Sequence, residues 1–187
     1  MKKIGGHISR RGFTIVELLI VIVVLGVLAA ITVVAYNGTQ TRANNTKTIQ
    51  GVVKYVRAMH LYSVNNGTYP IEASYPCLGI HPGTSCSVVG GTGTCLGAGG
   101  ASSQATFDTA IKSVLSGNLP DMSSQNINCG TAIVRGAYYS PSTGKDASIQ
   151  YYLKGNQNCD GIAGVASFSK SQTDDTTRCG IALPTLP

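Results

Sequence analysis

The sequence has little of what enzyme active sites are made from. Only eight of its 187 residues are Asp or Glu, and only three are His. The acids are scattered along the chain, and no G-x-S-x-G segment is present to expose a nucleophilic serine. Without a spaced pair of titratable groups, neither general acid–base catalysis nor an activated nucleophile has a place to form. We therefore expect a protein that is not an enzyme and has no catalytic residues.

Metal and nucleotide motifs are missing as well. The six cysteines form no C-x-x-C pair, and neither His60 nor His81 lies at a zinc-like spacing from any of them. The glycine-rich segment GTGTCLG is not G-x-G-x-x-G, and no Lys-Ser or Lys-Thr follows it. We therefore expect no metal and no other cofactor, and we favour disulfides. The cysteines are Cys77, Cys86, Cys95, Cys129, Cys159 and Cys179.

The net charge of +6 is concentrated at the N-terminus. Four of the fourteen basic residues, Lys2, Lys3, Arg10 and Arg11, precede a long apolar segment, which leaves ten basic against eight acidic residues and a charge of +2 for the rest. Basic residues before a membrane helix hold that end of the chain on the cytoplasmic side. The remainder then lies outside the cytoplasm, where disulfides persist.

The apolar segment, residues 13–35, is long enough as a helix to cross the hydrocarbon core of a bilayer. It contains one charged side chain, Glu17. A carboxylate in hydrocarbon is costly, so it usually has a partner or a task. A cleaved secretory signal peptide and an uncleaved anchor are alternative interpretations of the segment, but neither gives a reason for Glu17.

The run RRGFTIVELLIVIVVLGVLAAI resembles the N-terminus of a type IV prepilin. The resemblance to the type IV pilin and pseudopilin family covers about residues 1–70, and its most specific part combines the basic leader, the Gly-Phe junction and an acid four residues later. It implies that a prepilin peptidase removes the leader, residues 1–12 including His7, by cutting after Gly12. It also implies N-methylation of Phe13 and makes Glu17 the assembly glutamate.

Cleavage provides the missing partner for Glu17. The new α-amine of Phe13 has an ordinary pKa of about 7.7–8.0 and is mostly cationic at neutral pH. Phe13 and Glu17 are four residues apart on a helix, so their charges can pair within one chain. A pair between two chains would also fix how the two helices are aligned along their axes, because both charges are then satisfied only in one axial register. We therefore predict an assembly salt bridge between Phe13 and Glu17.

Residues 36–66 are predicted to continue the helix with an amphipathic pattern, because apolar residues return at helical spacing. The proline that kinks the first half of many pilin helices is absent, which leaves Gly26, Gly38 and Gly51 as helix breakers. The segment NNGTYP, residues 65–70, then ends the helix. The apolar positions are Ile49, Val52, Val53, Val56 and Met59.

Residues 67–187 are predicted to form an extracellular globular pilin-like domain, which makes the fold α+β. A short helix is expected within SSQATFDTAIKSVLSGNLP. The later segments AIVRGAYY, ASIQYYLK, AGVASFS and GIALP predict an antiparallel sheet of three to four strands. The long N-terminal helix, apolar in its first half and amphipathic in its second, is expected to pack on this sheet, with disulfide-tied loops around it.

The resemblance implies one disulfide, between Cys159 and Cys179, because many pilins have a disulfide-bounded C-terminal region. The other four cysteines allow three connectivities. The pairs that we favour are Cys86 with Cys95, across a glycine-rich turn, and Cys77 with Cys129.

The acids Asp160, Asp174 and Asp175 could form a calcium site, as related pseudopilins do near their C-terminus. They lack the spacing of oxygen ligands in a known calcium loop. Solvated loop acids are therefore the preferred interpretation.

Four tyrosines suggest a platform on which nucleic-acid bases could stack. At a charge of +2 behind the leader, however, side chains that pack a sheet are the better account, so nucleic acid is a conceivable partner without support. These residues are Tyr138, Tyr139, Tyr151 and Tyr152.

Together these features predict a structural subunit of an extracellular type IV pilus-like filament, assembled by packing of its N-terminal helix. The implied partners are identical or homologous pilin subunits, a prepilin peptidase, a membrane assembly platform and, before assembly, membrane lipid. The subunit would first span the cytoplasmic membrane once, with its C-terminus outside, and later lie in a pilus on the cell surface. The alternative is a minor pilin or pseudopilin that acts as a binding module in DNA uptake or protein secretion.

Overall fold

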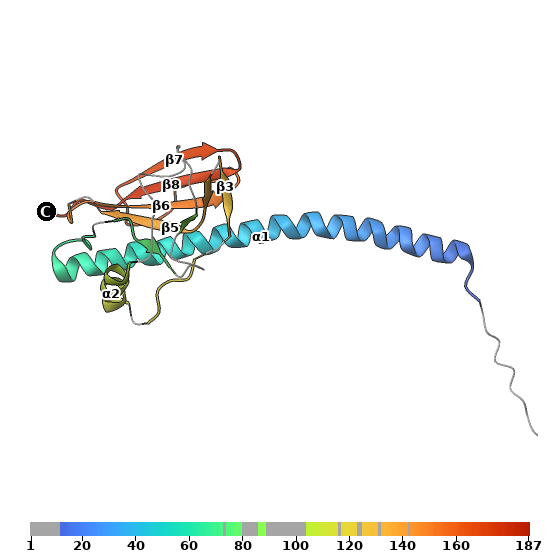
Figure 1. The fold of residues 1–187 in the computed structure, drawn as a ribbon, viewed down its shortest axis with the longest axis horizontal. Helices are drawn as coiled ribbons and strands as arrows, with labels where there is room; N and C mark the ends of the chain where they lie inside the picture. Colours follow the sequence, from blue (N-terminus) through green and yellow to red (C-terminus); the bar gives the residue numbers. More distant parts are fainter. Residues whose placement is uncertain are drawn as a thin grey trace, which may run out of the picture. The chain divides into compact units, whose positions relative to one another are not determined.

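The computed structural model describes residues 12–72, 74–79, 86–88, 104–115, 117–122, 125–130, 132–141 and 143–187. Packing divides the chain into two compact units, with the boundary between Gln40 and Thr41. Figure 1 shows the second unit, in which the strands lie beside the second half of the long helix. Within the described ranges the elements are α1 (Ile15–Asn66), β1 (Cys77–Leu78), β2 (Ser87–Val88), α2 (Ala105–Val114), β3 (Ile127–Cys129), β4 (Ala132–Val134), β5 (Ala137–Pro141), β6 (Ala147–Lys154), β7 (Ser167–Thr173) and β8 (Thr176–Ala182).

Helix α1 continues through all three glycines that the sequence marks as breakers, Gly26, Gly38 and Gly51. Gly51 has a packing role. A Cβ at this position would lie 2.7 Å from Cγ of Met122 and 3.2 Å from the backbone oxygen of Asp121. Glycine therefore allows the segment after α2 to approach the helix closely. This close packing offsets the low helix propensity of glycine.

The end of α1 follows the prediction from NNGTYP. The helix stops at Asn66, and Gly67 has the left-handed φ of 73° that favours glycine. The Gly67 N–H donates to the carbonyl oxygen of Ser63 at 2.8 Å, which satisfies one of the last carbonyls of the helix.

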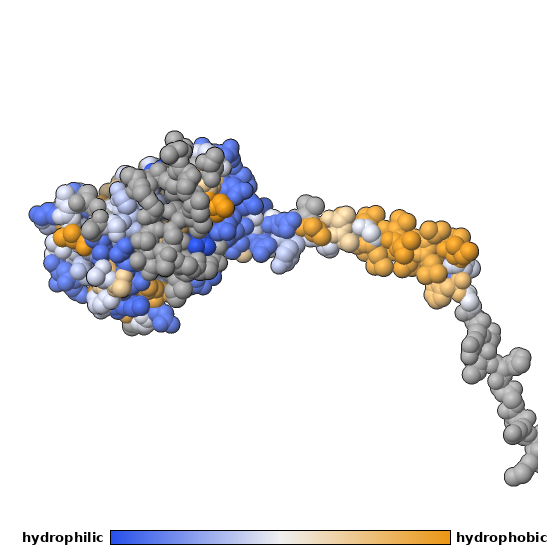
Figure 2. All heavy atoms as spheres, in the orientation of Figure 1, coloured by the Kyte–Doolittle hydropathy of each residue, from blue (hydrophilic) through white to orange (hydrophobic). Residues whose placement is uncertain are grey.

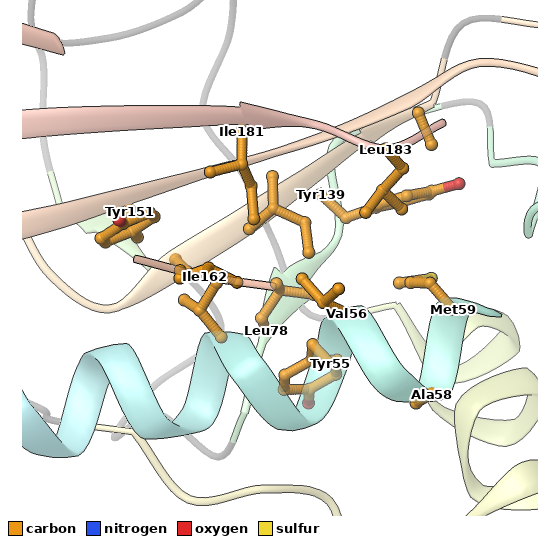
Figure 3. Close-up of a cluster of buried hydrophobic side chains, with 14 of the residues drawn as sticks. Tyr55, Val56, Ala58, Met59, Leu78, Tyr139, Tyr151, Ile162, Ile181 and Leu183 are labelled. Carbon is orange, nitrogen blue, oxygen red and sulfur yellow. The ribbon is translucent and has the colours of Figure 1, made fainter. Parts of the chain in front are cut away.

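The amphipathic half of α1 packs on the sheet through the predicted apolar face. Val52, Val56 and Met59 are buried, and Ile49 and Val53 lie half-buried at the margin of the core. Figure 3 shows side chains of this helix face directed toward side chains of the sheet. Removal of this apolar surface from water is what holds the second half of α1 to the domain.

The fold class is confirmed, with one more strand than the sequence predicts. The main antiparallel sheet has the order β1-β5-β6-β8-β7, and the additional strand is β1, whose two residues pair with β5. Two isolated residues in a cysteine-containing stretch carry no periodicity by which a strand could be recognised. Their extended conformation depends on pairing with β5, which is distant in sequence.

A second, three-stranded sheet in the order β2-β4-β3 was not predicted. It arises because the segment AIVRGAYY, expected as one strand, is interrupted at Gly136, where φ is 59°. The part before the interruption, β4, joins the second sheet, and the part after it, β5, joins the main sheet. A second apolar cluster forms on the face of the main sheet opposite α1.

The disulfides follow one expectation and overturn another. Cys159 is bonded to Cys179, as the resemblance implies, with the two Cα atoms 5.3 Å apart. Cys77 is bonded to Cys86 across a sequence separation of nine, so the favoured pairs Cys86 with Cys95 and Cys77 with Cys129 are both wrong. Cys95 itself lies outside the described residues, and Cys129 is also in a disulfide.

The Cys77–Cys86 bond has a topological cause. Cys77 opens β1, which pairs with β5, and the backbone N–H of Arg135 donates to the carbonyl oxygen of Cys86 at 3.1 Å. Because β4 and β5 are neighbours in sequence on either side of Gly136, their partner segments are brought together. The pairing therefore depends on strand contacts that cysteine spacing does not report.

Replacing both Cys159 and Cys179 with Ala in a Thr41–Pro187 fragment is expected to lower the free energy of unfolding by about 3 kcal/mol. The bond spans a sequence separation of 20 and restricts the unfolded chain. Chemical denaturation without reductant measures the loss. The matched control replaces Cys77 and Cys86, whose separation of nine predicts a loss smaller by about 0.6 kcal/mol. Unchanged stability of the first variant would contradict the prediction.

Candidate functional site

The first half of α1 exposes apolar side chains on every side of the helix. From Ile15 to Val33, the large hydrophobic residues whose side chains are described are between 48% and 79% exposed. Figure 2 shows this stretch as a continuous apolar surface on the face in view. Among the described residues, α1 is the one helix long and apolar enough to cross a membrane, judged by length and composition. Such a surface requires lipid or other apolar helices around it.

The predicted cleavage junction lies just before this helix. Gly12, Phe13 and Thr14 are outside α1, and Phe13 is 76% exposed. Apart from its own atoms and its two chain neighbours, no described heavy atom lies within 4 Å of the position that a Cβ on Gly12 would take. The peptide bond between Gly12 and Phe13 therefore precedes the helix, and its cleavage stays a prediction. The leader residues Lys2, Lys3, His7, Arg10 and Arg11 lie outside the described residues.

Glu17 has a partner that the sequence analysis missed. The backbone N–H and the hydroxyl of Thr14 both donate to Oε2 of Glu17 at 2.8 Å. In return, the Glu17 N–H donates to Oγ1 of Thr14 at 3.2 Å. This reciprocal arrangement is a capping box, in which the residue before the helix and the third helical residue satisfy each other's polar groups. The signal was present in the sequence as Thr-x-x-Glu at the start of an apolar run.

The capping box gives Glu17 a hydrogen-bond partner before the leader is removed. In the full chain the nitrogen of Phe13 belongs to a peptide bond, and the carboxylate is held by Thr14. Both hydrogen bonds from Thr14 go to Oε2. The salt bridge between the Phe13 amine and Glu17 requires cleavage and stays a prediction.

The C-terminal acids belong to the second unit. Asp160, Asp174 and Asp175 are exposed, and one oxygen of Asp174 accepts a hydrogen bond from the backbone N–H of Gly130 at 3.0 Å. Over the residues that the structure describes, no three His, Cys, Asp or Glu side chains are grouped to hold a metal ion.

The four tyrosines point alternately into the two apolar clusters. Tyr139 and Tyr151 lie in the core beneath α1, whereas Tyr138 and Tyr152 lie in the cluster on the opposite face of the sheet. Burial raises the pKa of Tyr151 to about 12 and also raises the pKa values of Tyr139 and Tyr152. With no more than 6% of any of the four exposed, they pack the sheet and offer no platform for bases.

Comparison with known proteins gives matches to part of the chain. The family described as the prokaryotic N-terminal methylation motif matches residues 8–33. The chain is similar to type II secretion system core protein G of Klebsiella michiganensis, with 36% identity over 62 residues, which are 33% of this chain and 44% of that protein. It is also similar to the protein of the same name from Pectobacterium carotovorum, with 38% identity over 61 residues, 33% of this chain and 39% of that protein.

The likeness to each of these relatives covers a third of the chain. The core protein G of Escherichia coli K12 is 36% identical over 62 residues, again 33% of this chain, and 43% of that protein is covered. The chain thus spans less than half the length of the curated relatives that it matches. No solved structure matches the chain.

Replacing Thr14 with Val is expected to loosen the first turn of α1 in the full-length chain, because the acceptor of the Glu17 N–H is removed. Hydrogen exchange of the Glu17 amide in detergent micelles should become roughly fivefold faster. Thr14→Ser keeps the hydroxyl and should leave the rate unchanged. The matched control is Thr32→Val, because the Thr32 hydroxyl donates to the carbonyl of Ala29 and caps no helix end. Equal rates in all variants would contradict the capping role.

Proposed function

Because its N-terminal segment makes this chain a member of the type IV pilin and pseudopilin family, we propose that it is a structural subunit of an extracellular type IV pilus-like filament. The observation that carries the proposal is Glu17, the one acid in a helix whose first half is apolar on every side. A tether needs the apolar surface alone. A subunit that must stop at one axial position beside its neighbours also needs a polar contact.

The two halves of the contact come from different chains. After cleavage, the amine of Phe13 on an incoming subunit would meet Glu17 of a subunit already in place. Because Thr14 bonds to Oε2, the carboxylate can keep its cap while Oε1 meets the amine. Opposite charges in an apolar bundle attract strongly, and a shift by one helical turn would leave both unpaired. The salt bridge therefore selects the register, and the surrounding apolar side chains provide the packing energy.

The proposal defines the parts of the chain and their partners. Residues 1–12 are the leader that a prepilin peptidase removes, with N-methylation of Phe13. Residues 13–35 lie in membrane lipid before assembly and in the filament core afterwards, residues 36–66 continue the helix, and residues 67–187 form the extracellular domain. A membrane assembly platform extracts the subunit, and identical or homologous pilin subunits surround it. Its role in this scheme is structural rather than catalytic.

A second candidate function is favoured by the names of the relatives. Proteins called type II secretion system core protein G match a third of the chain, which favours a pseudopilin of a secretion system. A minor pilin acting in DNA uptake belongs to the same alternative. Abundance distinguishes the two candidates, since a major pilus subunit dominates filaments sheared from cells, whereas a minor subunit or pseudopilin is present in traces.

Mass spectrometry of the protein from its native host is expected to find a mature chain that begins at Phe13 and carries one added methyl group on its amine. Gly12→Lys, which places a long charged side chain at the junction, should leave the leader attached. The matched control is Gly26→Ala, a glycine with no atom near its Cβ position, in the middle of α1. A native chain that begins at Met1, or one cut near Ala35, would rule out this processing.

Replacing Glu17 with Gln is expected to abolish most filament assembly while the subunit persists in the membrane. The amide retains an oxygen that can accept from Thr14, so the cap survives, but the negative charge that pairs with the Phe13 amine is lost. Shearing, electron microscopy and quantification of subunit in both fractions measure the outcome in cells whose only copy is the variant.

Two further variants separate charge from shape. Glu17→Val removes charge and cap together and should fail at least as severely, although membrane insertion is unaffected or improved. Thr14→Val removes the cap and keeps the charge, so it should assemble better than either Glu17 variant. Wild-type amounts of filament from both Glu17 variants would refute the assembly role of the carboxylate.

A further inference from the structure

The edge of the main sheet carries a hollow at strands β7 and β8. Strand β7 is the edge strand, and β8 lies beside it (Figure 1). The hollow has a volume of about 300 Å³, and sites that bind small molecules have volumes from about this value upward. The described residues that line it are basic or carry a hydroxyl, which favours a small polar ligand. They are Ser169, Lys170, Ser171 and Arg178.

The register of the sheet places two hydroxyls and a guanidinium on one face. Cys179 belongs to the core beneath α1, so its neighbours in β8, Arg178 and Gly180, face away from α1. Ser171 lies directly opposite Arg178, and Ser169 lies directly opposite Gly180. Side chains directly opposite one another share a face of the sheet, with Cβ atoms about 4.5–5.5 Å apart. The two serine hydroxyls and the guanidinium are therefore neighbours on the face turned away from α1.

Gly180 keeps the floor of the hollow low. A Cβ at this position would clash with Oγ of Ser169 and would lie 3.1 Å from Nε2 of Gln150. The φ of Gly180 is outside the left-handed region, so its backbone conformation does not require glycine. The hydroxyl of Ser169 donates to the Gly180 carbonyl at 3.4 Å and so lies over this residue. The missing side chain therefore makes room for polar groups close to the sheet.

Arg178 is oriented by the neighbouring strand. Its Nε donates to Oε1 of Gln150 on β6 at 3.0 Å, and the side chain is half-buried. The residue directly opposite it on β6, Tyr152, is buried in the second apolar cluster. A guanidinium presents its N–H donors in a rigid, planar fork that matches the oxygens of an anion. Because this cation is oriented and partly removed from water, it attracts an anion more strongly than a fully exposed side chain would.

The charges at the hollow are positive. Both charged residues of its described lining are basic, and Nζ of Lys170 is anchored 2.7 Å from Oδ1 of Asn156. The acids in the β7–β8 turn, Asp174 and Asp175, are not among the lining residues. The carboxylate of Asp174 accepts a hydrogen bond from the Gly130 N–H at 3.0 Å. The described lining therefore offers donors and positive charge to an anion, and no carboxylate to a cation.

We propose that the hollow binds a small tetrahedral oxyanion of the class of inorganic phosphate, with Arg178, Ser169 and Ser171 as donors. Arginine and serine side chains are ordinary donors to phosphate oxygens, and the bonds from arginine are strengthened by its charge. Phosphate is available free in solution and in the headgroup of an anionic phospholipid, and the same donors serve either source. The site belongs to the globular domain and does not depend on the proposed filament function.

Nuclear magnetic resonance of the full chain in micelles of an uncharged detergent tests the site. Inorganic phosphate, added at constant ionic strength, should shift the amide signals of Ser169, Ser171 and Gly180 saturably, with a Kd of about 1 mM. Arg178→Gln should weaken this binding at least about tenfold, because a charge-assisted hydrogen bond is lost. The matched control is Lys112→Gln, which removes one positive charge at an exposed position outside the hollow and should leave the Kd unchanged.

Ser171→Ala is a second variant, which changes an exposed side chain and leaves the bond between Arg178 and Gln150 intact. It should weaken phosphate binding roughly threefold, because one neutral hydrogen bond is lost. Short-chain phosphatidylglycerol, added in a separate titration, identifies the source: tighter saturation by the lipid supports a headgroup ligand, and tighter saturation by phosphate supports a free anion. Absence of saturable shifts in both titrations, or an unchanged Kd in a folded variant, would overturn the inference. The proposed function would then still stand, because neither titration involves a filament.

Discussion

The apolar circumference of the first half of α1 is the constraint on which the remaining features depend. Its side chains are exposed on every side, and removal of such surface from water is favourable by about 25 cal/mol per Å². The described part of the chain supplies nothing to cover it. The protein must therefore place this segment in lipid or among other apolar helices, and the polar groups at its start have to be compatible with both environments.

The capping box at Thr14 and Glu17 meets this requirement. A helix that begins in an apolar environment has backbone N–H groups without partners, and a carboxylate there lacks water. The capping box pairs the Glu17 carboxylate with the N–H and hydroxyl of Thr14, both at 2.8 Å from Oε2, so the polar groups satisfy one another within one turn. The proposed amine contact then adds to a carboxylate that is already fixed in position, which reduces the conformational entropy lost when subunits join.

The second half of α1 uses a different partner. Its apolar face is covered by the sheet, its close approach to Met122 depends on Gly51, and its outer face stays polar and basic. One unbroken helix thus joins a segment that needs partners from outside the described chain to a domain with its own core. Within α1, the match to the N-terminal methylation motif lies in the first of these two parts. In the proposed filament, packing against neighbouring helices would restrict the first half, whereas a sheet with a complementary apolar face covers the second.

The sequence by itself determined the features that depend on neighbours along the chain. The long helix, its end at Asn66 and Gly67, its buried stripe, the short helix α2 and the β-rich C-terminal region follow from periodicity and turn residues. The cap between Thr14 and Glu17 was equally local and could have been read from its four-residue pattern. Tertiary structure alone decided the strand count, the division of AIVRGAYY between two sheets, and the bond between Cys77 and Cys86. Each of these depends on which distant strand supplies hydrogen bonds to an extended segment, and that pairing energy is not encoded in the spacing of residues along the chain.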